Sequence, residues 1–173
     1  MNDPLIAMHA NLSVRAEMAN DIIGIRVVQT EAFPGPAEAD LVDRLREDRS
    51  AVLSLVAVLE QRVVGHAIFS RMEAPRGALC LGPVGVLASH RRQGVAARLI
   101  RKGLFAAKAG GWASVFVLGN PEYYHRFGFD ASLAMGFSSP YSGPHLMALE
   151  LQADALAVRE GCLQYPPAFA DLA

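Results

Sequence analysis

The sequence predicts a single α/β domain built around a mixed β-sheet. Apolar residues make up 52% of the 173 residues and charged residues only 19%, so the chain can bury a sizeable core. This length suits one compact domain, and residues 1–173 are therefore assigned to one. Apolar runs of strand length are interleaved with segments of helical periodicity, an alternation that is typical of mixed α/β folds.

Glycine and proline are scattered along the chain and do not cluster into a linker between domains. The expected elements, in chain order, are strand 12–17, helices 18–33 and 37–46, strands 51–59, 63–72 and 79–87, helix 94–108, strand 112–118, helix 121–127, and strands 146–151 and 161–165.

The first helix is expected from a 3.6-residue period that places Ala19, Ile22, Ile23, Arg26 and Val27 on one face, which is apolar except for Arg26. Pro34-Gly35-Pro36 breaks the chain after it. The second helix carries its acids early and its arginines late, as the helix dipole favours.

The next strands are expected from apolar runs rich in β-branched residues. Two of these runs flank Glu60-Gln61-Arg62, which predicts a β-hairpin. The third run is interrupted by Gly82-Pro83 and by Gly85. Proline cannot donate to a strand ladder and glycine often marks a bulge, so this strand is expected to be irregular.

The helix over 94–108 is expected to direct Val95, Leu99, Ile100 and Leu104 inward, and Gly110-Gly111 ends it. The β-branched and aromatic run that follows predicts a strand, and Pro121 favours a short helix start directly after it.

Composition excludes several classes of protein. Lys and Arg total 16 and Asp and Glu total 17, a net charge of −1, so no nucleic-acid partner is expected. Cys80 and Cys162 form no disulfide framework and no Cys/His cluster suggests zinc, so we expect a reducing cytoplasm and no metal. Met1–Asn11 lacks the basic start of an export signal. The longest charge-free apolar stretch, Ala78–Ala88, is shorter than the about 20 residues of a membrane span, so no membrane partner is expected.

One basic turn carries the first functional signal. Arg91-Arg92-Gln93-Gly94-Val95-Ala96 lies between a buried strand and a helix. The first turn of a helix has unpaired N–H groups and partial positive charge, which together suit a phosphate or pyrophosphate. Glycine lets the backbone approach such an anion closely. The turn is neither a GxGxxG dinucleotide fingerprint nor a Walker loop.

A second signal is the segment LGNPEYYHRFGF, residues 118–129, which places two tyrosines directly after a strand. Aromatic packing explains Phe127, Phe129 and one tyrosine. The other phenol is expected to face the cleft beside the 79–87 strand. A phenol has a pKa near 10 and can protonate a leaving thiolate of pKa near 8.5.

The pair RRQGVA and NPEYYHRFGF resembles the GNAT superfamily of acyl-CoA N-acyltransferases, and the chain is most similar to its small bacterial YhbS-like branch. The similarity covers nearly the whole chain in order, through AEADLVDRLR, VVGHAIFS, ALCLGPVGVLASHRRQGVAARLI, VFVLGNPEYYHRFGFDAS, LMALEL and YPPAF.

This resemblance implies a mostly antiparallel sheet with helices on both faces. Two neighbouring parallel strands, 79–87 and 112–118, splay apart and form the acyl-CoA cleft. The resemblance also implies roles for single residues. It implies a pyrophosphate-binding loop formed by Arg91, Arg92, Gln93, Gly94, Val95 and Ala96, and a strand segment that pairs with the pantetheine arm, formed by Val84, Gly85 and Val86. It further implies that Asn120 lies near that arm and that Tyr124 is the catalytic acid.

The resemblance also implies an acetyl-CoA-dependent N-acetyltransferase that passes acetyl directly to a primary amine of a small molecule, peptide or protein. An α-amino group, with a pKa of about 7.7–8.0, is deprotonated more easily than lysine at about 10.4. The loops Phe33–Glu38 and Phe129–His145 are expected to shape the acceptor site.

The general base stays unassigned, because residues 79–88 contain no acid where many family members place a glutamate. Glu31, His66 and Glu73 are candidates acting through water, although each also fits an ordinary surface or structural role.

Other functions stay open or are disfavoured. A non-catalytic acyl-CoA-binding module is the main alternative, and it predicts binding without turnover. A serine or cysteine hydrolase lacks its GxSxG elbow, and a histidine-base CoA acyltransferase lacks HxxxD, since no aspartate lies four residues after His125. The acceptor, the acyl-chain preference and the choice between monomer and homodimer are left open.

Overall fold

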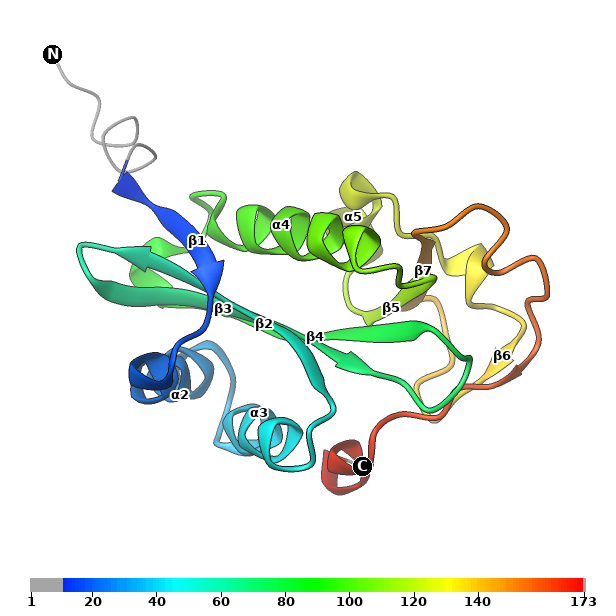
Figure 1. Ribbon diagram of the computed structural model, residues 1–173, viewed down its shortest axis with the longest axis horizontal. Coiled ribbons are helices and arrows are strands. Elements are labelled where there is room, and N and C mark those ends of the chain that lie inside the picture. Colours follow the sequence, from blue (N-terminus) through cyan, green and yellow to red (C-terminus); the bar gives the residue numbers. More distant parts are fainter. Residues whose placement is uncertain (1–10, 173) are drawn as a thin grey trace, which may run out of the picture.

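A six-stranded sheet forms the centre of the computed structural model, which describes residues 11–172 (Figure 1). The strands lie in the order β1 (Ser13–Ala16), β2 (Ala51–Leu59), β3 (Arg62–Arg71), β4 (Ala78–Val86), β5 (Ser114–Leu118) and β7 (Leu146–Glu150). Within this six-stranded sheet only β4 and β5 run parallel, and every other neighbouring pair is antiparallel. The predicted mixed sheet, mostly antiparallel with one parallel pair, is confirmed.

Helices cover both faces of this sheet (Figure 1). Helices α2 (Ile22–Ala32) and α3 (Ala37–Glu47) lie on one face, and α4 (Val95–Ala109) and the short α5 (Pro121–Tyr124) lie on the other. The C-terminal 3₁₀-helix Pro167–Leu172 contacts α3. A second, two-stranded sheet joins β6 (Phe137–Ser138) to β8 (Gly161–Cys162).

Helix α4 packs its apolar stripe onto the middle of the sheet, as predicted. Val95, Leu99 and Ile100 are fully buried. Gly103 lies so close to β3 that a Cβ on it would be 2.1 Å from Cε2 of Phe69. Helix and strand therefore approach each other more closely at this point than any larger residue permits.

The predicted inward face of α2 is wrong. Ile23 is 81% exposed and Val27 is 49% exposed, whereas Ile25, Val28 and Gln29 form the buried face. A polar glutamine counts as an outward residue in a hydrophobicity pattern, and here it is buried because its amide bonds to a partner inside the core.

Several element boundaries also differ from the predictions. The first helix begins at residue 22, because residues 19–21 form a 3₁₀ turn. The helix expected over 121–127 divides into α5 and a 3₁₀ turn at 125–127. The strand expected over 161–165 is only two residues long, and its partner β6 was not predicted.

No helix within residues 11–172 is both long and apolar enough to cross a membrane. The expectation that Met1–Asn11 is not an export signal concerns residues 1–10, which lie outside the described part of the chain.

Candidate active site

The parallel strands β4 and β5 part in the middle of the sheet. They pair side by side only as far as Leu81 and Val117. Gly82 and Pro83 have no paired partner on β3, because the register of that pairing shifts there, and residues 84–86 pair with β3 alone. Gly82 has a φ of +142°, which glycine adopts without steric cost. The second half of β4 therefore presents an unpaired edge to the gap.

Two backbone N–H groups of this edge face the gap. The N–H of Leu87 donates to the carbonyl of Val64 on β3 at 3.0 Å. Because backbone groups alternate between the two sides of a strand, Gly85 also faces β3, whereas Val84 and Val86 direct their N–H groups away from it. Of the three residues predicted to meet the pantetheine arm, Val84 and Val86 thus direct their backbone N–H groups toward the gap.

The basic turn begins helix α4 with an open anion site. Gly94 is the N-cap with a φ of +77°, and no side chain caps the helix. The first helical hydrogen bond runs from the N–H of Arg98 to the carbonyl of Gly94 at 3.0 Å. The N–H groups of Val95, Ala96 and Ala97 therefore have no partner within the helix. They face a cavity of about 460 Å³ that these residues line.

The three polar side chains of the turn have different roles. The guanidinium of Arg91 donates to the carbonyls of Val86 (3.3 Å) and Ala32 (3.2 Å), so it ties the turn to β4 and α2. Arg92 is exposed and lines the cavity. The amide N–H of Gln93 donates to a backbone carbonyl four residues earlier at 3.1 Å, and its buried Oε1 has no hydrogen-bond partner. Among residues 11–172, Arg92 thus has no hydrogen-bond or ion-pair partner, whereas Arg91 holds the turn in place.

Two residues that were not predicted complete this cavity. Tyr123 and Arg126 line it opposite the helix start, and the guanidinium of Arg126 lies 4.5 Å from the centre of the Tyr123 ring. Both belong to the segment NPEYYHRFGF, so the signal was present, but only the fold shows that this segment faces the basic turn.

Tyr124 lies on α5 with its ring among aromatic neighbours. Its centroid is 5.2 Å from that of Tyr123 and 5.7 Å from that of Phe129, both edge to face. Burial raises the pKa of the Tyr124 phenol to about 12, with smaller contributions from Tyr123 and from the Cys80 thiol on β4. The phenol is protonated at neutral pH and lies within electrostatic reach of β4.

Asn120 has a structural role in this fold. Its Oδ1 accepts a hydrogen bond from the N–H of Glu122 at 3.0 Å, which makes it the N-cap of α5. The exposed Asn120 side chain therefore positions the helix that carries Tyr124, and it lines neither of the two cavities beside the splayed strands.

A second cavity, of about 260 Å³, opens where β4 and β5 part, on the α3 side of the sheet. Its lining is almost entirely apolar or aromatic and contains one side chain that is charged at neutral pH, Glu38 of α3. The lining residues are Glu38, Leu41, Cys80, Leu81, Gly82, Pro83, Phe116, Val117, Leu118, Tyr141, Leu146, Tyr165 and Phe169.

The two loops expected to shape the acceptor site each supply one residue to this cavity, Glu38 and Tyr141. Tyr165 and Phe169 were not predicted as lining residues. They arrive there because the C-terminal segment returns to α3, an arrangement that no local pattern in the sequence reveals.

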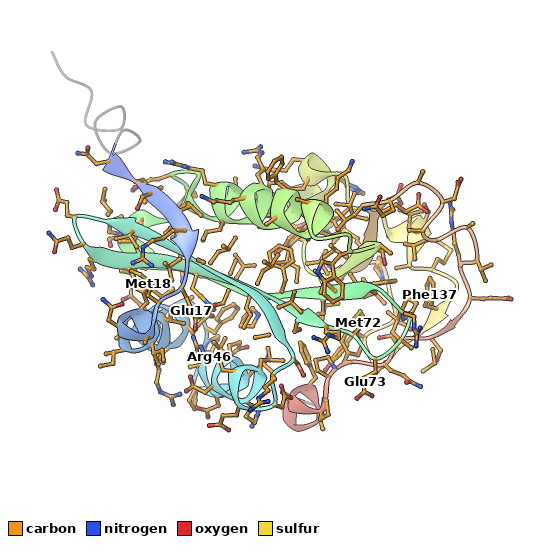
Figure 2. All side chains as sticks on the ribbon, viewed as in Figure 1. Glu17, Met18, Arg46, Met72, Glu73 and Phe137 are labelled. Atoms are coloured by element: carbon orange, nitrogen blue, oxygen red, sulfur yellow. The ribbon has the colours of Figure 1, made fainter. Side chains whose placement is uncertain are left out.

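The three candidate bases lie outside both cavities. The carboxylate of Glu31 accepts from the N–H of Ala88 at 2.8 Å, at the end of β4. Glu73 is exposed in the turn after β3 (Figure 2). Neither is placed to receive a proton from an acceptor in the 260 Å³ cavity.

His66 on β3 is fully buried, and its ring belongs to a chain of polar contacts with residues of α2 and β2. Its Nδ1 accepts from the Gln29 amide (2.8 Å) and its Nε2 donates to Ser54 Oγ (2.8 Å), while the Ser54 hydroxyl donates to Glu17. The Glu17 carboxylate in turn binds Arg46 at 2.6 Å (Figure 2). Burial lowers the pKa of His66 to about 3, so the ring is neutral and acts as a structural link.

No group of three or more His, Cys, Asp or Glu side chains suited to a metal ion occurs within residues 11–172.

Comparison with known proteins agrees with this geometry. Residues 22–129 match the model of the acetyltransferase (GNAT) family. The N-acetyltransferase YjhQ of Escherichia coli K12 is 40% identical over 134 residues, which cover 72% of this chain and 74% of YjhQ. The crystal structure of E. coli YhbS in complex with CoA has a TM-score of 0.86 at 31% identity and covers 92% of both chains.

A further solved structure extends the comparison. A GNAT acetyltransferase from Brucella melitensis, in complex with acetyl-CoA, has a TM-score of 0.78 at 31% identity and covers 91% of this chain and 97% of its own. The family model spans more than half of the chain, and the relatives match it over most of their length. The chain therefore belongs to the acetyltransferase (GNAT) family.

Proposed function

We propose that this protein transfers the acetyl group of acetyl-CoA directly to a primary amine. One observation carries the proposal. The open N-terminus of α4, Val86 at the end of β4 and Tyr123 of α5 line one cavity. The complexes of the Brucella relative with acetyl-CoA and of YhbS with CoA support it.

The residues of the first cavity fit a CoA diphosphate. Three backbone N–H groups at the start of α4 lack partners in the helix and point toward one site. Arg92 and Arg126 supply positive charge around it. The N–H groups of Val84 and Val86 continue the path along β4, as an extended pantetheine arm requires.

Bound acetyl-CoA supplies an activated acetyl thioester. The N–H groups of Val84 and Val86 are placed to donate to its carbonyl oxygen, in the manner of an oxyanion hole. Tyr124 provides the proton that the departing thiolate needs. Holding the amine and the thioester together supplies much of the remaining acceleration.

Direct transfer is favoured because the cleft offers no nucleophile for an acyl-enzyme. Cys80 is the cysteine at the cavity, and burial raises the pKa of its thiol to about 12. Since the thiolate is the reactive form of cysteine, this side chain stays inert. A near-neutral charge and reduced cysteines fit a cytoplasmic protein that acts on amines rather than nucleic acids.

A ligand screen by thermal unfolding tests the donor. Acetyl-CoA at about 100 times its dissociation constant should stabilise the fold by about 2.7 kcal/mol, which raises Tm by about 5–10 °C. NAD and ATP should raise it far less. No shift with acetyl-CoA contradicts the proposal outright. A shift without thiol release across a library of amines would instead identify a non-catalytic binding module.

A further inference from the structure

The cavity on the α3 side combines one carboxylate with an apolar wall. The side chain of Glu38 forms no hydrogen bond or ion pair with any residue in the range 11–172. Asp40 and Asp43 on the same helix, by contrast, both pair with Arg26, at 2.7 and 2.6 Å. Of the two acids of this helix without a partner among residues 11–172, Glu38 and Glu47, only Glu38 lines the cavity.

Aromatic side chains line the same cavity as Glu38. Tyr141 and Tyr165 meet edge to face with centroids 5.3 Å apart, and Phe169 lies 5.4 Å from Tyr165. The faces of such rings attract a cation, and their bulk excludes water from an apolar group. One carboxylate with aromatic rings around it is complementary to a ligand that carries a single positive charge on an apolar body.

The dimensions of the cavity limit that body. Its volume of about 260 Å³ lies just below the range of about 300–1,000 Å³ that is usual for small-molecule sites. A single ring or a short alkyl chain fits this space. A second ammonium group would find no second carboxylate in the lining.

We infer that the acceptor is a small primary monoamine with an apolar body, such as an arylalkylamine, and that Glu38 binds its ammonium group. The inference rests on the proposed function and names its substrate class. The amine body contacts the ring wall of Tyr141, Tyr165 and Phe169, and the nitrogen lies toward the gap between β4 and β5.

Glu38 then acts as the missing base. It takes one proton from the ammonium, and the free amine forms the C–N bond to the acetyl carbon as the C–S bond breaks. The thiolate leaves with the C–S electron pair and receives a proton from Tyr124. The Tyr124 phenolate takes the second nitrogen proton, which leaves a neutral amide, and Glu38 releases its proton to solvent. Acetyl-CoA and an alkylammonium thus give an N-alkylacetamide, CoA thiol and one proton.

The first test compares acceptors. Acetylation of 2-phenylethylamine, followed by thiol release at saturating acetyl-CoA, should have a kcat/KM about 10²-fold above that of putrescine, whose second charge has no partner. Equal or better use of putrescine overturns the inference while leaving the acetyltransferase proposal intact.

The second test uses Glu38→Gln. This change should lower kcat/KM for 2-phenylethylamine about 10²-fold, and a higher pH should partly restore it by supplying free amine. The thermal shift with acetyl-CoA should not change. Glu47→Gln is the matched control, because Glu47 is an exposed acid on the same helix outside the cavity. Wild-type kcat/KM in Glu38→Gln overturns the role of Glu38.

Calorimetry of 2-phenylethylamine binding separates this inference from the proposed reaction. If Glu38→Gln weakens the binding of 2-phenylethylamine, Glu47→Gln does not, and no acetylation occurs, the amine site is supported and the proposed acetyltransferase activity is contradicted. If other amines cause thiol release but 2-phenylethylamine does not bind, the acetyltransferase activity is supported and the amine site inferred here is contradicted.

Discussion

The ring of Tyr124 lies directly against Gly119, the residue that follows β5. A Cβ built on Gly119 would lie 2.3 Å from Cε2 of Tyr124, a distance that real Cβ atoms do not show. Glycine at this position therefore lets the ring of Tyr124 pack directly against the chain at the end of β5. The motif LGNPEYY thus contains both the proposed acid and the space that its ring occupies.

Tyr124→Phe keeps the ring and removes the proton donor. The catalytic rate should fall by about 10²–10⁴-fold, while affinity for acetyl-CoA changes little, because pyrophosphate and backbone contacts carry that affinity. Thiol release at saturating substrates measures the rate. Tyr123→Phe is the control: Tyr123 lines the first cavity, but the change keeps its ring against Arg126, so the rate should be nearly unchanged. Equal turnover in Tyr124→Phe and wild type would show that the thiolate takes its proton from water.

Gly119→Ala should lower the rate without touching the acid itself. The added methyl group displaces the Tyr124 ring, so we expect a fall in kcat of about 10-fold or more, since misplacing a catalytic group by about 1 Å can cost 10²-fold. The thermal shift with acetyl-CoA should persist. In the Tyr124→Phe background the same change should lower kcat little further. Strictly additive losses would mean that Gly119 acts through something other than Tyr124.

Gly94→Val should abolish the thermal shift with acetyl-CoA. The φ of +77° is strained for a β-branched residue, and a side chain at this point obstructs the approach of an anion to the start of α4. Gly111→Val is the matched control, since it has a φ of +80° just beyond the other end of the same helix. Both variants should lose some stability, but only Gly111→Val should still respond to acetyl-CoA.

Acidification should destabilise the fold through His66. Burial lowers the pKa of the folded histidine to about 3, whereas the unfolded chain binds that proton near pH 6.5. The stabilisation that comes from the neutral His66 ring is therefore fully present above pH 6.5. Below that pH the free energy of unfolding decreases, by about 2 kcal/mol between pH 7.5 and pH 5. Glu17 does not titrate in this window. Burial alone would raise its pKa, but the hydrogen bonds from Arg46 and Ser54 outweigh that effect and lower it.

The urea midpoint measured across this pH range tests the assignment. His66→Asn should start from a lower stability and lose most of the decline between pH 6.5 and pH 5. An unchanged decline in this variant would assign the acid sensitivity to other groups.

Gly103→Ala should destabilise the protein although alanine is the better helix former. An ordinary exposed exchange of this kind inside a helix gains about 1 kcal/mol. Here the new Cβ would lie 2.1 Å from the Phe69 ring, so α4 must move off the sheet, at a net cost of about 1–3 kcal/mol. Gly103→Ala combined with Phe69→Leu should recover part of the loss, and urea unfolding of both variants measures this coupling.

The sequence predicted those parts of the fold and site that depend on local patterns. The basic turn before α4 and the tyrosine segment after β5 carry their chemistry within a few residues. The face of α2 was misassigned because Gln29 is polar yet buried through its bond to His66. A hydrophobicity pattern cannot represent a polar group whose partner comes from another strand.

Glu38 illustrates the other limit. In the sequence it is one of several acids at the start of a helix, and Phe169 is one apolar residue near the C-terminus. They line one cavity only because α3 and the C-terminal segment both reach the point where β4 and β5 part. These distant segments come together because of the topology of the whole sheet, so a local stretch of sequence does not predict their contact.

One cavity lies against the start of α4 and the other against α3. These two helices cover opposite faces of the sheet (Figure 1). Under the proposed reaction, neither substrate crosses the path of the other, and neither product must leave before the second substrate can enter. Initial-rate measurements with both concentrations varied should therefore give intersecting double-reciprocal lines, the kinetic form of a ternary complex, rather than the parallel lines of a substituted enzyme.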